Sequence, residues 1–431
     1  MRLAVYRGTR EVGGTCIEIQ AATTRLIFDL GMPLYLANGT QIDMNSIRTQ
    51  SRDELLASGV LPRVPGLTQG GDPPSAIFLS HAHADHSGLV GYSPDCVPIH
   101  ATRGTSKMML ASSLFARQPE LPRDRYREVK PDAATRVGDV TVTAYRVDHS
   151  AFDSVAYLIE SEGQRVLYSG DLRLHGRKPW MARQLIAAVK REPLHALLLE
   201  GTHVGAAHRQ RETESELEER VIRLLTRTAG LALAAYSPVN LDRLVTFYRA
   251  ARRSRRIFVA DVYTAFVMHL AAGQAHVPVP GRDAGVRVFY PAGVTARGAR
   301  AKVSKLFEHA KIEKDEILRS PQKHLMQFRS AILDRDFGGI LPPESVLIYS
   351  YWSGYLKRPD WRQLVARLER LGVRIELIHT SGHIFPEDIQ RFVAALAPKT
   401  VIPIHTFHAR QFEDKIPQVT VLEDGQWYEV Q

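Results

Sequence analysis

Residues 77–88 read IFLSHAHADHSG and place four metal-binding side chains directly after a short apolar run. Alternate side chains of an extended loop point the same way, so His81 and His83 can hold one metal ion. Asp85 and His86 lie past a bend and can reach a second ion. Imidazole nitrogen combined with carboxylate oxygen suits zinc or manganese. The stretch therefore predicts a site for two metal ions at the end of a buried strand.

Other apolar runs along the chain end in the same way. TRLIFDLG carries Asp29, RVDHS carries His149, YSGDLR carries Asp171 and IPIHTFH carries His405. Polar residues that end buried strands lie at the rim of a sheet, where several loops can converge. We therefore expect these side chains to gather with the HAHADH segment at one edge of the fold.

The composition is that of an ordinary globular protein of about two domains. The chain has 431 residues, of which 44% are hydrophobic and 24% are charged. No apolar run is long enough to span a bilayer. The N-terminus, MRLAVYRGTREVGG, lacks the pattern of a secretory signal, so a cytoplasmic location is expected. Cys16 and Cys96 lie in apolar contexts and are expected to be small core residues.

The net charge of +10 permits a polyanionic partner without identifying one. Part of this charge lies in ARRSRRIF, where Arg252, Arg253, Arg255 and Arg256 end a predicted helix. These arginines could contact a nucleic-acid backbone. A solvated helix end that complements the helix dipole is the other interpretation.

The order of the predicted elements indicates one domain inserted into another. The first 205 residues read as strands and loops. Predicted strands then alternate with helices, beginning with a helix that has a capping box at Thr213, which argues for a mostly parallel sheet covered by helices. Strands that end in histidine return near the C-terminus. We expect a host domain formed by 1–205 and 376–431, with an α/β domain inserted at 206–375.

The series of Asp29, HAHADH, His149 and Asp171, in this order and at strand ends, resembles the metallo-β-lactamase superfamily. The resemblance implies a four-layered αββα sandwich that binds two zinc ions. By motif, the implied ligands are His81, His83 and His149 for the first ion, and Asp85, His86 and His405 for the second, with Asp171 bridging. Asp29 would support the site without binding metal, by accepting a hydrogen bond from a ligand N–H.

Three further positions resemble the β-CASP nucleases of that superfamily, which include ribonuclease J and the cleavage and polyadenylation endonuclease. Glu200 in LLLEGTH matches their motif A, His383 in HTSGH matches motif B, and His405 in PIHT matches motif C. The inserted segment then corresponds to a Rossmann-like β-CASP domain. In this group histidine at motif C accompanies RNA-processing members, whereas DNA-processing members carry valine. The resemblance therefore implies a single-stranded RNA substrate.

The implied reaction is hydrolysis of an RNA phosphodiester by a water activated between two metals, as an endo- or exoribonuclease. Asp85 and Asp171 are the catalytic carboxylates at the metals. His383 is the expected proton donor to the leaving ribose oxygen, oriented by Glu200. Two structural interpretations stay open, namely an ion pair of Glu200 and His383 at the domain junction and a structural role for His405.

Several small polar residues could line a phosphate path, although ordinary turn chemistry is an equal interpretation. They are Ser237, Ser353, Gly354 and Ser381. The aromatic residues of YSYWSGY could stack on bases or pack in the core.

Three other functions fit parts of the sequence. A DNA nuclease of the same group is the nearest of them. A small-molecule ester or thioester hydrolase leaves the inserted domain, His383 and the basic charge unexplained. A non-catalytic binding partner would lack ligands, whereas here every motif position is filled. Ribonuclease J enzymes also continue into a further C-terminal domain, and this chain ends soon after LEDGQWYEVQ, so dimerisation and 5′-end specificity are not implied.

Overall fold

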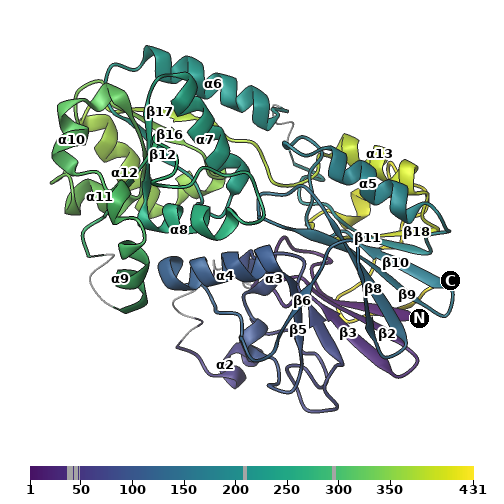
Figure 1. Ribbon diagram of the computed structural model, residues 1–431. Helices are drawn as coiled ribbons and strands as arrows, with labels where there is room; N and C mark the ends of the chain where they lie inside the picture. The colour runs from purple at the N-terminus through teal and green to yellow at the C-terminus, as the bar shows by residue number, and fades with distance from the viewer. Residues whose placement is uncertain (36–41, 43–46, 48, 207–210, 294–297) are drawn as a thin grey trace.

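The computed structural model describes residues 1–35, 42, 47, 49–206, 211–293 and 298–431. The described residues form three β-sheets. Two of these sheets lie in the half of the molecule that carries both termini, and the third lies in the other half (Figure 1). Within these ranges, no helix is long and apolar enough to cross a bilayer.

The first two sheets pack face to face as the inner layers of a sandwich. The first has the order β19 (Trp427–Glu429), β1 (Arg2–Arg7), β2 (Cys16–Ala21), β3 (Thr24–Phe28), β4 (Ala76–Phe78), β5 (Ile99–Thr102) and β6 (Tyr126–Val129). The second has the order β18 (Thr400–Ile404), β11 (Ala196–Glu200), β10 (Gln164–Tyr168), β9 (Val155–Ser161), β8 (Val140–Arg146) and β7 (Ala134–Val137). Apolar side chains fill the space between them, where the ring centroids of Phe28 and Tyr157 are 5.5 Å apart.

Helices cover the outer face of each sheet. The helices beside the first sheet are α2 (Arg52–Ala57), α3 (Ala84–Ser87) and α4 (Arg103–Ala116), and those beside the second are α5 (Trp180–Val189) and α13 (Pro386–Leu396). Leu55 and Met109 belong to the apolar cluster outside the first sheet, and Leu185 and Phe392 to the cluster outside the second. The predicted four-layered αββα sandwich is confirmed.

The third sheet is entirely parallel. Its order is β14 (Val286–Phe289), β13 (Ile257–Asp261), β15 (His324–Gln327), β12 (Ala232–Ala235), β16 (Val346–Tyr349) and β17 (Arg374–Leu377). One face packs against α6 (Glu214–Arg227), α7 (Leu241–Arg253) and α8 (Val262–Ala271), and the other against α10 (Lys314–Arg319), α11 (Ser330–Arg335) and α12 (Pro359–Arg370). This is the Rossmann-like inserted domain that the strand and helix alternation predicts.

The structure corrects three details of the sequence analysis. β15 lies in the middle of the third sheet between β13 and β12 and was not expected, because HLMQ is short and half polar. β17 pairs with β16 as far as Leu377, so the inserted domain continues past the expected boundary at residue 375. Cys16 is buried as expected, but Cys96 is exposed, because it lies in a turn before β5.

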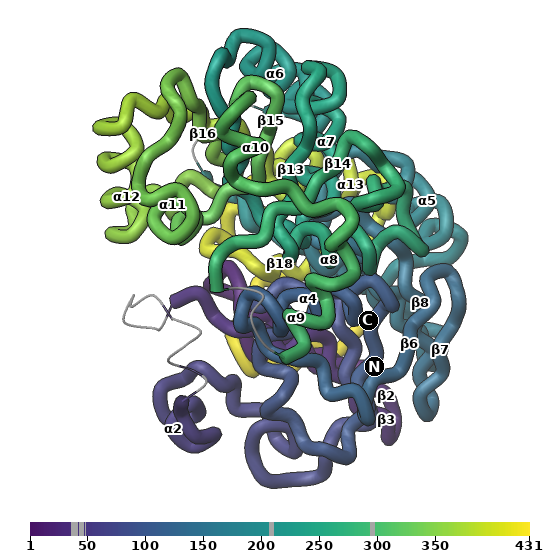
Figure 2. The backbone as a smooth tube through the Cα atoms, turned by 60° about the vertical axis from the view of Figure 1, so that its left-hand side comes forward, coloured from purple at the N-terminus to yellow at the C-terminus, as the bar shows by residue number. Residues whose placement is uncertain are grey.

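The inserted domain rests on α4 of the sandwich. α8 and α9 (Gly298–Lys305) lie against this helix (Figure 2). Met108 and Ala111 of α4 belong to the apolar cluster of the inserted domain. The hydroxyls of Ser112 and Tyr263 are 3.0 Å apart across the same contact. The two domains therefore share part of one core.

A buried ion network also joins the two domains. Arg173 of the sandwich is fully buried and donates to Asp148 Oδ1 at 2.9 Å. It also contacts two carboxylates of the inserted domain, Glu214 Oε1 at 3.2 Å and Asp242 Oδ2 at 2.7 Å. Arg243 donates to the same Glu214 oxygen at 2.9 Å. Removing one member would leave charges buried without a partner, so the network opposes separation of the domains.

Replacing Glu214 by Gln should destabilise the protein at neutral pH. Burial would raise the pKa of Glu214, but Arg243 and Arg173 outweigh burial and hold that pKa well below its usual range. The carboxylate therefore stabilises the fold at pH values above its unfolded pKa of about 4.3, and this stabilisation is lost as the pH falls toward the folded pKa. We expect E214Q to lower the free energy of unfolding by about 3–5 kcal/mol at pH 7, measured by urea denaturation.

The difference between the wild type and E214Q should shrink between pH 5 and pH 3. Glu413→Gln is a matched control at an exposed position, and it should unfold as the wild type does at both pH values. A difference that stays constant or grows on acidification would contradict the assignment of this stabilisation to the Glu214 carboxylate.

Candidate metal centre

The carboxyl ends of several strands meet at one edge of the sandwich. β3 runs parallel to β4, and β10, β11 and β18 are parallel neighbours. Asp29 follows β3, His81 follows β4, Asp171 follows β10 and His405 follows β18, while His149 follows β8 of the second sheet. The structure thus brings together the side chains that the sequence places at strand ends.

The HAHADH segment turns from extended chain to helix at its second histidine. His83 is the N-cap residue of α3, with φ −68° and ψ 148°. His81 and His83 therefore lie on extended backbone, and Asp85 and His86 lie in the first turn of the helix. This bend divides the four side chains between two groups.

His81, His83 and His149 form the first group, in which one ring nitrogen of each lies within 4.8 Å of the others. Burial holds the pKa of His81 and of His149 well below the usual value, so both rings are neutral. His81 Nδ1 lies 3.0 Å from the Ser80 hydroxyl, and His149 Nδ1 lies 2.6 Å from the carbonyl oxygen of Gly382. Because a carbonyl only accepts, His149 carries its proton on Nδ1 and keeps a lone pair on Nε2 for a metal.

Asp85, His86, Asp171 and His405 form the second group, again with ligand atoms within 4.8 Å of one another. His86 Nε2 lies 3.1 Å from Asp171 Oδ2, and His405 Nε2 lies 3.5 Å from Asp85 Oδ2. The same Asp171 oxygen is 3.9 Å from Nε2 of two histidines of the first group. Asp171 therefore lies between the two groups, where a bridging carboxylate would be.

Several of these buried atoms have no hydrogen-bond partner among the described residues. They are Nε2 of His81, His86 and His405 and both carboxylate oxygens of Asp171. Each unpartnered buried polar atom costs about 1–3 kcal/mol, a cost that a bound cation removes. Burial would raise the pKa of Asp171, but His405 and His86 outweigh burial and keep it well below its usual range, so the carboxylate is ionised, as a metal ligand must be. The two groups therefore fit divalent metal ions.

Asp29 supports the second group from behind. Its carboxylate accepts hydrogen bonds from the Ser80 hydroxyl at 2.6 Å and the Tyr168 hydroxyl at 2.5 Å, and it lies 2.7 Å from His86 Nδ1. Because Nδ1 donates to Asp29, Nε2 of His86 is left for the metal. Asp29 and His405 both have left-handed backbone, with φ of 59° and 51°. Side chains rarely adopt this conformation, which costs of order 1–3 kcal/mol.

Glu200 and His383 form a pair beside the metal-binding groups. His383 Nδ1 lies 3.2 Å from Glu200 Oε1 and 3.6 Å from Asp171 Oδ2. Glu200 is fully buried and also accepts the backbone N–H groups of Leu172 and Ile384. Burial lowers the pKa of His383, but Glu200 and Asp171 outweigh burial and raise it to about 9. Because Nδ1 and Oε1 already pair with each other, the geometry favours a positioned imidazole over a further metal ligand.

The exposed side of the cluster carries two side chains. His383 is 21% exposed and Asp85 is 19% exposed, whereas His81, Asp171 and His405 are at most 1% exposed. A substrate would therefore reach the cluster beside His383 and Asp85.

The loop of Thr380, Ser381 and Gly382 is held by both domains. The carbonyl of Thr380 accepts a hydrogen bond from Arg243 of the inserted domain, and the carbonyl of Ser381 accepts one from Arg173 of the sandwich. Gly382 has no room for a side chain, because a Cβ there would lie 2.4 Å from a neighbouring hydroxyl oxygen. The loop thus presents the Gly382 carbonyl to a metal-binding histidine at a fixed position.

Sequence reasoning missed several residues that orient the cluster. They are Ser80, Tyr168, Arg173, His175, Thr202 and His203, together with the carbonyl of Gly382. Ser80, Arg173 and Thr202 lie within two residues of a motif residue, which is the signal that could have found them. The others approach the cluster only through the fold.

The small residues predicted to line a phosphate path fall into two sets. The Ser381 hydroxyl is used inside its own loop, where it lies 2.6 Å from His203 Nε2 and accepts the backbone N–H of His383. Ser353 and Gly354 begin a 3₁₀ turn, η4 (Ser353–Lys357). Ser237 is partly buried in the turn between β12 and α7.

The predicted arginine contacts lie far from the metal-binding groups. Arg256 is 5% exposed and donates to four backbone carbonyls, so its guanidinium is not available to RNA and that prediction is corrected. Arg252 and Arg253 pair with carboxylates at the end of α7, and Arg255 is exposed with φ of 57°. Arg243, in the first turn of α7, is the arginine near the cluster, and the helix extends about 15 Å beyond it.

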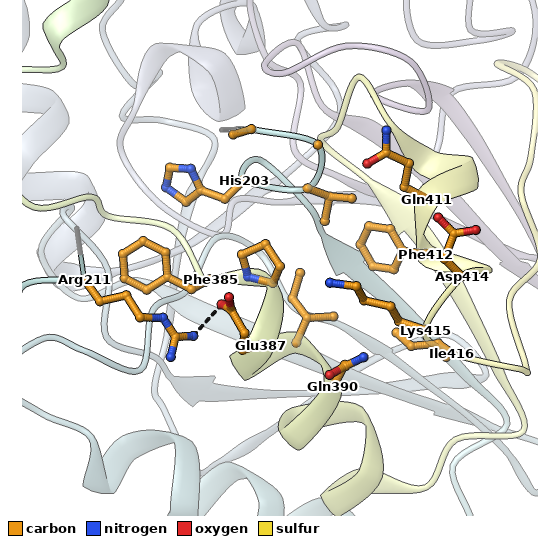
Figure 3. Close-up of a pocket in the computed structure, with 15 residues that line it drawn as sticks. His203, Arg211, Phe385, Glu387, Gln390, Gln411, Phe412, Asp414, Lys415 and Ile416 are labelled. Carbon is orange, nitrogen blue, oxygen red and sulfur yellow. Dashed lines mark hydrogen bonds and ion pairs between the residues drawn. The ribbon is translucent and has the colours of Figure 1, made fainter. Parts of the chain in front are cut away.

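A cavity of about 310 Å³ lies beside the cluster and contains none of its metal-binding side chains (Figure 3). Phe385 forms one wall and stacks on His203 with 5.4 Å between ring centroids. Arg211 and Glu387 form an ion pair of 2.6 Å across this side. His203 also contacts Ser381, so this wall supports the loop of the cluster from behind.

Comparisons with known proteins place the chain in a family. Residues 51–236 match the beta-lactamase superfamily domain. Ribonuclease J of Pyrococcus abyssi is 26% identical over 373 residues, which cover 77% of this chain and 74% of that protein. Ribonuclease J2 of Bacillus subtilis is 22% identical, with 97% and 72% covered. Transcription termination factor FttA of Methanothermobacter thermautotrophicus is 26% identical, with 61% of this chain covered, and the match spans only 41% of that longer protein.

A solved structure has the same fold over the whole chain. It is a protein of unknown function from Enterococcus faecalis V583, with a TM-score of 0.81, 22% identity and 99% of both chains covered. The sandwich, the inserted parallel domain, the ligand groups at strand ends and the relatives agree. The chain belongs to the metallo-β-lactamase superfamily, in its β-CASP, ribonuclease J-like group.

Proposed function

We propose that this protein is a metal-dependent phosphodiesterase that hydrolyses single-stranded RNA. The observation that carries the proposal is the placement of the His383–Glu200 pair beside two groups of metal ligands, on the exposed side of the cluster. A positioned imidazole next to two divalent ions suits phosphodiester hydrolysis. The names of the ribonuclease J relatives support RNA as the polymer. We expect zinc as the metal, with manganese as the alternative, and a cytoplasmic location.

The residues of the cluster divide the chemical work. His81, His83 and His149 would hold one ion, Asp85, His86 and His405 would hold the other, and Asp171 would bridge them. Bound there, the ions supply an activated water and stabilise charge on the phosphate oxygens. His383 holds a proton, and its bond to Glu200 leaves Nε2 for the substrate, so His383 can protonate the leaving ribose oxygen. The depth of the other ligands restricts approach to the side of Asp85 and His383.

Trp352 is a second part of the proposed RNA site. It is 42% exposed, and its ring lies over Gly354, where a Cβ would be 2.3 Å from the ring. Tyr355 lies edge-on to it, with 5.4 Å between ring centroids, and Arg358 lies 5.9 Å from the Tyr355 ring. Burial raises the pKa of Tyr355 and the charge of nearby Asp85 adds to this, so the group lies close to the open side of the cluster. A base could stack on the free face of Trp352.

The RNA assignment is tested with single-stranded RNA and DNA of one sequence, labelled at the 5′ or the 3′ end. Purified full-length protein with its metals counted should cut the RNA, and Asp171→Ala should be inactive because the bridging carboxylate is lost. The product ladder distinguishes internal cleavage from degradation from one end. Protein that holds about two metals and cuts neither polymer would contradict the proposal, and cleavage of the DNA alone would make it a DNA nuclease.

His383→Ala should slow RNA cleavage by about 10²–10⁴-fold, because it removes the proton donor. Metal content should stay that of the wild type, since the ligand groups are intact. The measurements are single-turnover cleavage rates and metals counted by plasma mass spectrometry. Loss of metal in proportion to loss of activity would show that His383 acts at the metals and not as an acid.

Trp352→Ala should raise KM for single-stranded RNA by about 5- to 150-fold with little change in kcat, because one base–aromatic stack is worth about 1–3 kcal/mol. Trp180→Ala is the matched control, since Trp180 is equally exposed at 43% but lies on α5. Steady-state kinetics on one labelled oligonucleotide give both constants. Equal KM values for the two variants would remove Trp352 from the RNA site.

A further inference from the structure

The Thr202 hydroxyl lies where the metal-binding groups and the proposed acid meet. Thr202 comes two residues after the end of β11, and its Oγ1 is 2.8 Å from Glu200 Oε2. The same oxygen is 2.9 Å from His405 Nδ1 and 3.1 Å from His383 Nδ1. One hydroxyl therefore contacts a carboxylate and two imidazoles that belong to motifs A, B and C.

The number of protons on this hydroxyl determines its hydrogen bonds. A threonine hydroxyl donates one proton and can accept two hydrogen bonds. The Glu200 carboxylate only accepts, so the Thr202 proton goes to Glu200 Oε2. The hydroxyl oxygen then accepts from both imidazoles, which requires a proton on Nδ1 of His405 and on Nδ1 of His383.

We propose that Thr202 is a positioning residue that fixes this tautomer of His405 and His383. With the proton of His405 on Nδ1, its Nε2 keeps the lone pair that the second metal-binding group needs, and this atom is the unpartnered one. With Nδ1 of His383 held by Thr202 and Glu200, its Nε2 is the nitrogen left for a substrate. The part that concerns His405 depends only on the metal site, and the part that concerns His383 rests on the proposed RNA cleavage.

Thr202 matters more to His405 than to His383. The other acceptor near His405 Nδ1 is Asp171 Oδ1 at 3.7 Å, beyond hydrogen-bond distance. His383 keeps a direct contact with Glu200 at 3.2 Å if the hydroxyl is lost. Removing the hydroxyl therefore leaves His405, which is 1% exposed, free to move its proton to Nε2 and lose the lone pair.

The experiment compares Thr202→Val, which keeps the shape of the side chain, with Thr202→Ser, which keeps the hydroxyl. We expect T202V to bind one of two zinc ions about 10- to 100-fold more weakly, and T202S to bind both as the wild type does. Zinc retained after dialysis against graded chelator, counted by mass spectrometry, gives the affinities. RNA cleavage should fall with the zinc in T202V and be restored in T202S.

Thr264→Val is the control for loss of a buried threonine hydroxyl. Thr264 is fully buried in α8, and its hydroxyl has no hydrogen-bond partner among the described residues. T264V should bind both zinc ions with the affinity of the wild type. Equal zinc affinity in T202V and T202S would overturn the proposal, whether or not the wild type cuts RNA. A wild type that cuts no RNA would contradict the proposed function and leave the zinc comparison valid.

A measurement on the wild type covers the case in which T202V does not fold. Long-range ¹H–¹⁵N spectra of the zinc-loaded protein, with His405 assigned by loss of its signals in His405→Gln, report which ring nitrogen carries the proton. A proton on Nδ1 of His405 supports the proposal, and a proton on Nε2 overturns it.

Discussion

The hydrogen bond at the far nitrogen of each metal-binding histidine is the interaction on which this molecule depends. A buried imidazole can present either nitrogen, and only one arrangement serves a metal. The partners are Ser80 for His81, Asp29 for His86, the Gly382 carbonyl for His149 and Thr202 for His405. They come from four different parts of the chain. The position of each part is therefore constrained by the same cluster, and the meeting of parallel strand ends at one edge satisfies these constraints together.

The same constraint joins the site to the arrangement of the domains. The loop that offers the Gly382 carbonyl to His149 is also bonded to Arg243 of the inserted domain and Arg173 of the sandwich. Arg173 and Arg243 share the Glu214 carboxylate. A movement of one domain against the other would therefore disturb a metal-binding histidine. The position of the inserted domain and the geometry of the cluster form one hydrogen-bonded unit.

Much of the sandwich and of the cluster could be predicted because the signals are local. The HAHADH spacing and the polar ends of apolar runs point to residues that the structure brings within a few ångströms, and the capping box at Thr213 marks the start of α6. The partners of the ligands could not be predicted in this way, because a serine, a threonine or a backbone carbonyl carries no pattern. Arg256 was misplaced for a related reason. A surface arginine and one that satisfies the carbonyls of a helix end look alike in sequence.

The left-handed backbone of Asp29 and His405 makes the centre a place where the protein is less stable than it could be. Glycine would relieve this conformation at both positions, but it would remove one ligand and the support of another. The side chains thus hold the chain in a conformation that the fold alone would not select. Engineering that ranks substitutions by thermal stability would favour replacing these two residues, and a more heat-resistant protein obtained in that way would have lost its metals.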